Sequence, residues 1–481
     1  MKPKKNSTLK QHKYSKELKI IQPPLLSMRG VTTTSWLNDR LPEYLWLGLI
    51  LMNFNRTEGI KTACKILEEI SKINKDLIKP KLSNILSLDD IQQINIFRII
   101  CAQTSPKCLS PLTVIYRNSK YPVFNEYFNV CQITFEDRLN LINKAIKLYY
   151  DHQSDSATDL RYTISAMMIF QKKLHIAPNC SKIAEAIQSY PLTNHDDEKM
   201  KSYRPAIRTL EMNDFGEDQN ITFIEQFWTE ISLKNECQPT IIRQETSMTE
   251  INYNEYIEAY QKKLTYLIYE QKKLSILDDK FNVILGTISY VLKIFNELVD
   301  SNLGDGILGR NAFRTILESY VNLKYLLLLE KENSNVWKEY KFYGIGKYKF
   351  ALLKNRENQE HKAVHFNETL IDAIVNEDTW EEFISIDPNF FDKKSIKEKF
   401  KEVGEQQLYE TCYEYNNNFV HGFWGAIRES SMLHCNDASH RYHSTPDVTF
   451  QQKMPCVYSD IKMIMDKLSN ILDEEFPNEN Q

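Results

Sequence analysis

The chain has 481 residues, of which 26% are charged, and a formal net charge of −4 at pH 7. This length suffices for two or three domains with a sizeable core. The slightly acidic balance argues against a protein that binds nucleic acid over its whole surface, so any contact with RNA has to be local. Glycine and proline are scarce, which favours long helices over a turn-rich β fold. We therefore predict an all-α protein with two helical domains.

The N-terminus is the exception to this balance. Seven lysines and one glutamate lie within residues 1–19. The segment lacks the uninterrupted apolar stretch of a secretory signal, and Pro23 and Pro24 follow it. We predict a basic flexible tail over residues 1–34, which either touches phosphate groups or stays solvated.

Apolar residues recur at helical spacing through the first half of the chain. Leu41 to Asn53 is a strongly apolar segment with Pro42 in its first turn. Thr57 to Ile73 is the next, and further helices are expected at 88–101, 135–150, 158–172, 181–189 and 221–232. No segment keeps the alternation of a β-strand for long. The pattern predicts an N-terminal helical domain over residues 35–235, of unknown role.

The expected domain boundary is residues 234–252, a proline-containing stretch without a helical period. Longer helices follow it, at 256–276, 280–299, 307–329, 406–432 and 457–472. They predict a C-terminal helical bundle over residues 253–475.

The sequence predicts a cytoplasmic protein without a transmembrane segment. The longest largely apolar run, Leu41 to Phe54, contains Glu43 and falls short of the ~20 residues that span a bilayer. Nine cysteines are spread along the chain without a C-x-x-C pair. We interpret them as mostly buried free thiols in a reducing cytosol.

Three sequence patterns resemble known cofactor or metal motifs. Gly304-Asp-Gly306-Ile-Leu-Gly309 has the letters of a dinucleotide fingerprint, but a helical segment precedes it where that chemistry needs a strand. We interpret it as a tight turn between helices. His361 and His365 are four residues apart and lack an evident third ligand. Four zinc-type ligands share one polar loop whose spacing fits no standard finger: His434, Cys435, His440 and His443. We assign no cofactor and no metal.

Two helices with polar rims carry the candidate chemistry. The first places Arg310, Arg314 and Glu318 four residues apart, so that they are neighbours on one helix face. In the second, a rotation of about 100° per residue puts Asn417 and His421 on one stripe with Arg428.

The residue types on these rims suit phosphodiester chemistry. A histidine can take or give a proton near neutral pH, and an arginine can clamp a phosphate. Cleavage of RNA without a metal needs such groups. The alternative is structural: Arg314 and Glu318 form an ordinary intrahelical salt bridge, and His421 donates to a backbone carbonyl.

Two segments together resemble a known family: the helix RTILESYVNLKYLL, and about a hundred residues later the helix YEYNNNFVHG. They resemble the bacterial domain-of-unknown-function family numbered 5677, over roughly residues 255–475. That family is similar to HEPN domains, which are helical bundles. Many HEPN domains are metal-independent endoribonucleases of defence and toxin–antitoxin systems, in which two copies of an Arg-x(4–6)-His motif form one site.

The resemblance implies specific roles for residues of this chain. His421 matches the motif histidine, and Asn417 matches the polar residue that often follows the motif arginine. The arginine itself does not carry over, because Glu414, Tyr415 and Asn416 occupy the expected positions.

Two hypotheses follow. In the first, the protein is a homodimeric, bacterial defence-type endoribonuclease with catalytic and substrate-binding residues on the two rims: His421, Arg314 and Arg428 as catalytic groups, and Asn417, Arg310 and Glu318 as substrate-binding groups. In the second, the bundle is a non-catalytic scaffold or sensor. It then binds a protein partner from the same operon through an exposed apolar patch.

Overall fold

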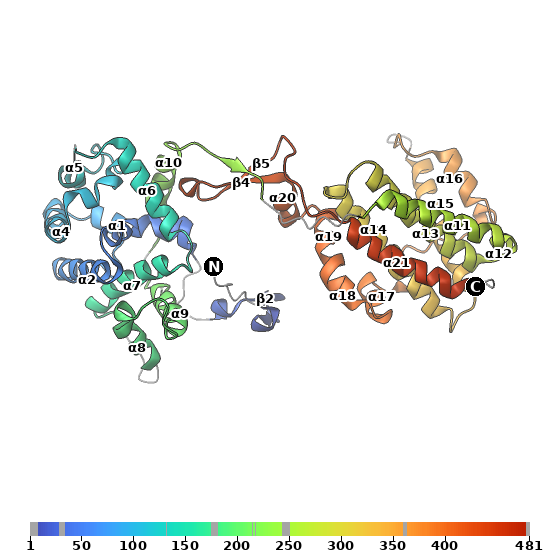
Figure 1. The fold of residues 1–481 in the computed structure, drawn as a ribbon, viewed down its shortest axis with the longest axis horizontal. Helices are drawn as coiled ribbons and strands as arrows, with labels where there is room; N and C mark the ends of the chain where they lie inside the picture. The colour runs from blue at the N-terminus through green and yellow to red at the C-terminus, as the bar shows by residue number, and fades with distance from the viewer. Residues whose placement is uncertain are drawn as a thin grey trace. The chain divides into compact units, whose positions relative to one another are not determined.

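The computed structural model describes residues 8–27, 34–130, 132–174, 181–213, 215–216, 218–242, 251–358 and 363–477. The chain forms two compact units (Figure 1). The N-terminal unit contains residues 1–240 and the segment 435–443. The C-terminal unit contains residues 241–434 and 444–481. Two parts of the expected tail, residues 1–7 and 28–33, lie outside the described residues, as does His361.

The N-terminal unit is built of helices: α1 (Leu41–Met52), α2 (Arg56–Ile73), α3 (Leu82–Leu86), α4 (Asp90–Gln103), α5 (Pro122–Phe128), α6 (Phe135–Tyr149), α7 (Asp155–Phe170), α8 (Ser181–Ser189), α9 (Met200–Glu211) and α10 (Ile221–Ser232). Shorter helical turns lie at Leu9–Gln11, Pro24–Ser27, Trp36–Arg40, Pro106–Cys108, Ser110–Val114 and Tyr190–Leu192. The helix predicted from Leu41 is confirmed as α1, with Pro42 in its first turn.

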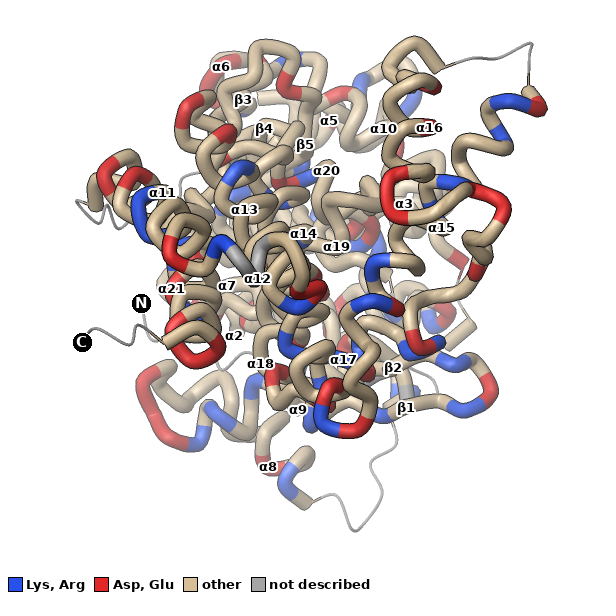
Figure 2. The backbone as a smooth tube through the Cα atoms, turned by 90° about the vertical axis from the view of Figure 1, so that its right-hand side faces the viewer, with Lys and Arg blue, Asp and Glu red and all other residues tan. Residues whose placement is uncertain are grey.

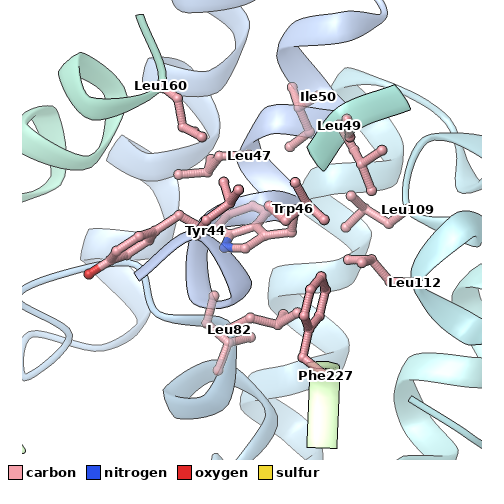
Figure 3. Packing of buried hydrophobic residues seen from close by; sticks show 14 of the residues in the cluster. Tyr44, Trp46, Leu47, Leu49, Ile50, Leu82, Leu109, Leu112, Leu160 and Phe227 are labelled. Atoms are coloured by element: carbon pink, nitrogen blue, oxygen red, sulfur yellow. The ribbon is translucent and has the colours of Figure 1, made fainter. Parts of the chain in front are cut away.

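The core of this unit surrounds α1, which contacts α2, α6, α7 and α10. Every residue of α1 from Leu41 to Leu51 is buried. Figure 3 shows Trp46 in the middle of this core, among Leu82, Leu112 and Phe227. Its indole Nε1 donates to the Pro80 carbonyl at 3.0 Å, because a buried N–H needs a partner.

A buried ion cluster lies beside this core. The Glu211 carboxylate, at the end of α9, is fully buried and accepts from two guanidinium groups, Arg161 at 2.8 Å and Arg40 at 2.5 Å. Arg161 is itself 2% exposed. Burial alone would raise the pKa of the Glu211 carboxyl, but the charges of Arg161, Arg40 and Lys79 outweigh burial and lower that pKa below its ordinary value. Glu211 is therefore an ionised carboxylate held inside the unit.

The C-terminal unit contains longer helices: α11 (Tyr253–Glu270), α12 (Lys272–Leu277), α13 (Asp279–Asp300), α14 (Ile307–Leu329), α15 (Val336–Glu357), α16 (Glu368–Val375), α17 (Ile396–Glu402), α18 (Gln406–Leu408), α19 (Glu414–Val420), α20 (Trp424–Ser431) and α21 (Tyr458–Glu475). A π-helical turn, Tyr409–Tyr413, joins α18 to α19, and 3-10 turns lie at Glu381–Phe383 and Phe391–Lys393. Another lies at Ala438–His440, in the segment that belongs to the N-terminal unit.

The core of this unit forms where α13, α14 and α21 pack on one another, as the ribbon shows (Figure 1). α13 is the one described helix long and apolar enough to cross a membrane, by length and composition only. Its apolar side chains serve the core instead: Phe281, Ile284, Ile288, Val291 and Phe295 are all buried. α13 therefore contributes one buried face to the core, with 44% of its most apolar 18-residue window buried.

The helical prediction is confirmed for most of the described chain, but the expectation of an all-α fold needs one correction. Short strands are present: β1 (Lys13–Ser15), β2 (Ile20–Gln22), β3 (Pro239–Thr240), β4 (Met432–Cys435) and β5 (Ser444–Pro446). β1 and β2 form an antiparallel hairpin inside the lysine-rich tail, and β4 pairs with β5 antiparallel, with Leu433 opposite Thr445. Strands of two to four residues are too short to show a period-2 pattern in the sequence.

Charged residues of both signs are interspersed along the described helices and loops (Figure 2). The lysines of the hairpin region are the local exception that the sequence predicted. This mixture agrees with the small net charge.

The glycine-rich pattern between α13 and α14 is a turn between two helices. A Cβ on Gly309 would lie 2.6 Å from the Leu303 carbonyl oxygen, and a Cβ on Gly304 would lie 2.4 Å from the Tyr458 ring. Helix α13 stands where a dinucleotide site needs a strand. These glycines are therefore explained by close packing.

Candidate functional site

Three side chains form a closed hydrogen-bonded cluster between α14 and the start of α19. The Arg314 guanidinium lies 2.9 Å from the Glu318 carboxylate and donates to the Tyr413 hydroxyl at 2.7 Å. Tyr413 in turn donates to Glu318 at 2.5 Å. The structure therefore brings together Arg314 and Glu318, as the sequence predicted, and adds a tyrosine from the second helix.

Tyr413 is the member of this cluster that the sequence analysis missed. Burial foremost, and then the hydrogen bond to Glu318, raise the pKa of Tyr413 well above its ordinary value of 10.0. The phenol therefore keeps its proton and remains a donor at neutral pH. A sequence signal was present, because Tyr413 lies four residues before Asn417 and eight before His421, on the same helical stripe.

Arg310 is buried and structurally engaged. It is 6% exposed, and its Nη2 donates to the Pro455 carbonyl at 2.7 Å. Its Cζ lies 5.6 Å from the ring centroid of Tyr415 and 5.9 Å from that of Phe419. Since Arg314 contacts residue 413 and Arg310 contacts residues 415 and 419, α14 and α19 run antiparallel. Arg310 thus fastens the two helices together.

The helix predicted over residues 406–432 does not continue past His421. Gly422 has a φ of +59°, and the Phe423 N–H donates to the Asn418 carbonyl at 3.0 Å. Such a left-handed glycine with a long back-bond is a Schellman ending. The prediction that Arg428 shares a helical stripe with Asn417 and His421 is therefore wrong, because Arg428 belongs to a separate helix, α20.

The remaining predicted residues take part in none of the hydrogen bonds of the Arg314 cluster. Arg428 donates to the Met432 carbonyl at 3.2 Å and so closes the end of α20. Asn417 is half-buried, and its backbone carbonyl accepts from His421 N–H at 3.3 Å. His421 is exposed, and its ring stacks on Phe423 with 5.4 Å between centroids.

The described contacts do not bring His421 to Arg314. The hydrogen bonds of Arg314 lie at Tyr413 and Glu318, and Tyr413 is eight residues before His421, which is about 12 Å along a helix. Among the described hydrogen bonds, none involves the His421 ring, so that ring has no carbonyl partner of the kind the structural alternative required. The His421 imidazole and the Arg314 guanidinium are thus both present on this pair of helices, but they lie at different positions along the helix axes.

The comparison with known families addresses the same stretch of chain. Residues 281–440 match the family of unknown function DUF5677. This stretch is a DUF5677 region. It runs from α13 to the segment after α20 and contains all six residues predicted for the site. No curated protein and no solved structure matches the chain.

The end of α19 and the start of α20 expose large apolar side chains within this DUF5677 region. Val420, Phe423, Trp424 and Ile427 are 41%, 54%, 64% and 39% exposed. No Lys, Arg, Asp or Glu lies between Val420 and Ile427 in the sequence. We call these four residues the 420–427 surface. Exposed apolar groups that lie together in this way are typical of interaction sites.

Concave pockets in the C-terminal unit lie elsewhere. One of about 1020 Å³ is bounded by α13 and α15, with Asp279, Lys341 and Asp378 in its wall. Another of about 880 Å³ has Glu332, Asp387 and Asp392 in its wall. Neither pocket is lined by any of the six residues predicted for the site. Of those six residues, Arg310, Arg314 and Glu318 instead hold α14 against α19, and none of the six belongs to the 420–427 surface.

A group of zinc-type ligands is present in the N-terminal unit, and two of its members lie within the stretch that matches DUF5677. Three members of the predicted polar loop, Cys435, His440 and His443, gather there with Cys237. His434, the fourth loop residue considered from the sequence, is replaced in this group by Cys237. Sequence spacing did not reveal Cys237, because it precedes the loop by almost 200 residues.

Proposed function

We propose that the C-terminal unit is a helical self-association module, and that the 420–427 surface docks against the same surface of a second copy of this chain. The observation that carries the proposal is the exposure of Phe423 and Trp424, at 54% and 64%, side by side in a segment without charged residues. An apolar surface without a dominant charge is complementary to itself, so a two-fold axis can pair it with its own copy. The resemblance to HEPN domains, many of which act as dimers, supports the same partner.

The local structure suits this role because the docking residues are held on fixed elements. Arg310 and the Arg314–Tyr413–Glu318 cluster tie α19 to α14. The Schellman ending at Gly422 sets where α20 begins. Aromatic side chains on such a base contribute a large apolar area at little cost in conformational entropy. The free thiols among the described cysteines agree with action in a reducing cytosol.

The experiment is to measure mass in solution for the full chain and two variants. We expect a dimer for wild type and a monomer for Trp424→Asp, because a carboxylate would have to be desolvated in the interface. Trp380→Asp is the matched control, since Trp380 is 70% exposed in the same unit but lies outside the 420–427 surface. A wild-type chain that stays monomeric at about 100 μM, or a Trp424→Asp chain that still dimerises, contradicts the proposal.

RNA cleavage by such a dimer is the second candidate. It is favoured by the exposed His421 ring, which lies next to Phe423, so pairing the 420–427 surfaces would bring two imidazoles to one interface. Two histidines could then divide the work: one takes the 2′-OH proton as that oxygen attacks phosphorus, and the other protonates the leaving 5′-oxygen. The products would be a 2′,3′-cyclic phosphate and a 5′-hydroxyl.

The two candidates separate in one set of assays. RNA cleavage in the presence of a chelator, lost in His421→Ala while the dimer remains, supports the nuclease. A dimer that leaves tRNA and mRNA intact supports a non-catalytic scaffold, as expected for a component of a bacterial defence or toxin–antitoxin system. Co-purification with a protein encoded by a neighbouring gene would further support the non-catalytic scaffold.

A further inference from the structure

Two cysteines and two histidines meet within the N-terminal unit, although they come from distant parts of the chain. Cys237 lies five residues beyond the end of α10, and Cys435, His440 and His443 lie on the segment 435–443 of the same unit. Each offers one ligand atom, and these atoms all lie within 4.8 Å of one another. Cys237 Sγ and His443 Nε2 are 3.2 Å apart.

We propose that these four side chains bind one zinc ion as a structural Cys2His2 site. Zinc binds sulfur at about 2.3 Å and nitrogen at about 2.0–2.1 Å in a tetrahedron, which puts the ligand atoms about 3.4–3.8 Å apart. The ligand atoms here, all within 4.8 Å of one another, therefore have to move by no more than about 1.5 Å to reach the spacing of a zinc-bound site. Two thiolates with two imidazoles favour zinc over magnesium or calcium. Four protein ligands fill the tetrahedron and leave no open position for a substrate.

The orientation of His440 fits this role. Its Nε2 lies 3.2 Å from the Ser232 carbonyl oxygen and 3.2 Å from the Asn235 carbonyl oxygen. Carbonyl oxygens only accept, so Nε2 carries the hydrogen and Nδ1 keeps a lone pair. Histidines bound to metals commonly donate their second ring N–H to a backbone carbonyl, which fixes the ring and its tautomer. The end of α10 thus holds His440 in the form that a metal needs.

The backbone of the segment also brings its ligands together. Cys435 N–H donates to the His443 carbonyl at 2.9 Å, and His443 N–H donates to the His440 carbonyl at 3.1 Å. Between the two histidines, Arg441 and Tyr442 have left-handed φ values of 57° and 50°. Bulky residues keep this conformation only where their surroundings enforce it. The Tyr442 ring packs on Tyr150, with 4.7 Å between centroids, so packing of the segment maintains the turn.

The ion would fasten the segment 435–443 to the end of α10. Cys237 and Cys435 are almost 200 residues apart in the sequence, and a metal that bridges such distant residues couples its binding free energy to folding. The zinc site is independent of the proposed self-association, because none of its ligands belongs to the 420–427 surface.

The first test measures zinc per chain by elemental mass spectrometry on the full-length protein, purified without chelators. We expect about one zinc per chain in wild type and a loss of about 10-fold or more in Cys237→Ser. Cys237 is exposed, so this change leaves the core intact. Two matched controls should keep their zinc: His434→Ala, the loop histidine outside the group, and Cys456→Ser, another exposed cysteine.

The second test replaces the ion with Co²⁺, whose intense visible absorption reports tetrahedral thiolate coordination. We expect these bands in the wild type and in His434→Ala, and their loss in Cys237→Ser. Three results overturn the proposal: wild type that neither contains zinc nor takes it up, a Cys237→Ser variant with undiminished zinc, or a Cys237–Cys435 disulfide in freshly purified protein. A disulfide would consume the two thiolates that the ion requires.

Discussion

The Arg314 guanidinium donates a 2.7 Å hydrogen bond to the Tyr413 hydroxyl, and this contact joins α14 to the start of α19. The same hydroxyl donates to Glu318, so the pair that resembled a simple intrahelical salt bridge is part of the packing between two helices. This relationship determines how the residues predicted for a site divide: Arg310, Arg314 and Glu318 hold the helices, whereas His421 faces solvent.

Removing the Tyr413 hydroxyl should destabilise the C-terminal unit. In Tyr413→Phe, both the hydrogen bond from Arg314 and the one to Glu318 are lost. We expect the free energy of unfolding to fall by about 1–2 kcal/mol, measured by urea denaturation. Tyr348→Phe, at a tyrosine that is 48% exposed, is the control and should stay within about 0.5 kcal/mol of wild type. Equal effects of the two variants would argue against a role for the cluster in stability.

Truncation of Arg310 should lower the stability of the protein far more than truncation of His421. Arg310→Ala leaves the Pro455 carbonyl without its donor and removes packing from Tyr415 and Phe419, so we expect a loss of about 2–3 kcal/mol. His421→Ala removes an exposed ring and should change stability by less than about 0.5 kcal/mol. Thermal denaturation of both variants checks this. A strongly destabilised His421→Ala chain would show that the ring is buried in the native assembly.

The buried Glu211 carboxylate should make stability depend on pH. Its pKa is lowered in the folded state from an ordinary value of 4.5, so the stabilisation is fully present above that value. It is lost as the pH falls through the folded-state pKa. Glu211→Gln should remove this acid dependence and cost about 3–5 kcal/mol at pH 7, because Arg161 keeps its charge without a partner.

Urea denaturation at pH 7 and at stepwise lower pH measures both effects of Glu211→Gln. Glu198→Gln is the control: its side chain is 81% exposed and pairs with Lys201 at the surface, where such pairs contribute little. If the stability of Glu211→Gln falls with decreasing pH as much as that of the wild type, other carboxylates dominate acid unfolding.

Two glycines offer a test of close packing in α13 and α14. Gly309→Ala places a Cβ 2.6 Å from the backbone oxygen of Leu303, which cannot move without opening the turn. We expect a loss of about 1–3 kcal/mol. Gly286→Ala, in the middle of α13 with nothing within 4 Å of the new Cβ, should instead stabilise by about 0.4–1 kcal/mol. Thermal unfolding of the two variants should therefore shift in opposite directions.

The helices were predictable where the helical spacing of apolar residues begins and ends at the same positions as the helix itself. α14 begins and ends where the apolar period predicted, at Ile307 and Leu329. The segment from 406 to 432 misled, because Phe419, Phe423 and Ile427 keep a helical spacing across Gly422. A single left-handed residue ended the helix there and moved Arg428 off the stripe. The glycine in Val420-His421-Gly422 was a possible signal for the end of the helix, but the helical spacing of the apolar residues on both sides of it predicted a continuous helix.

The amino-acid sequence alone determined the helical character of the chain, the turn at Gly304–Gly309, the contact of Arg314 with Glu318 and the likeness to DUF5677. Each of these depends on residues close together in the chain, whose spacing on a helix is fixed by backbone geometry. Only the tertiary structure placed Tyr413 on Arg314, exposed the 420–427 surface and carried Cys237 to Cys435, His440 and His443. Those relationships depend on the path of the chain between distant residues, which local periodicity does not encode.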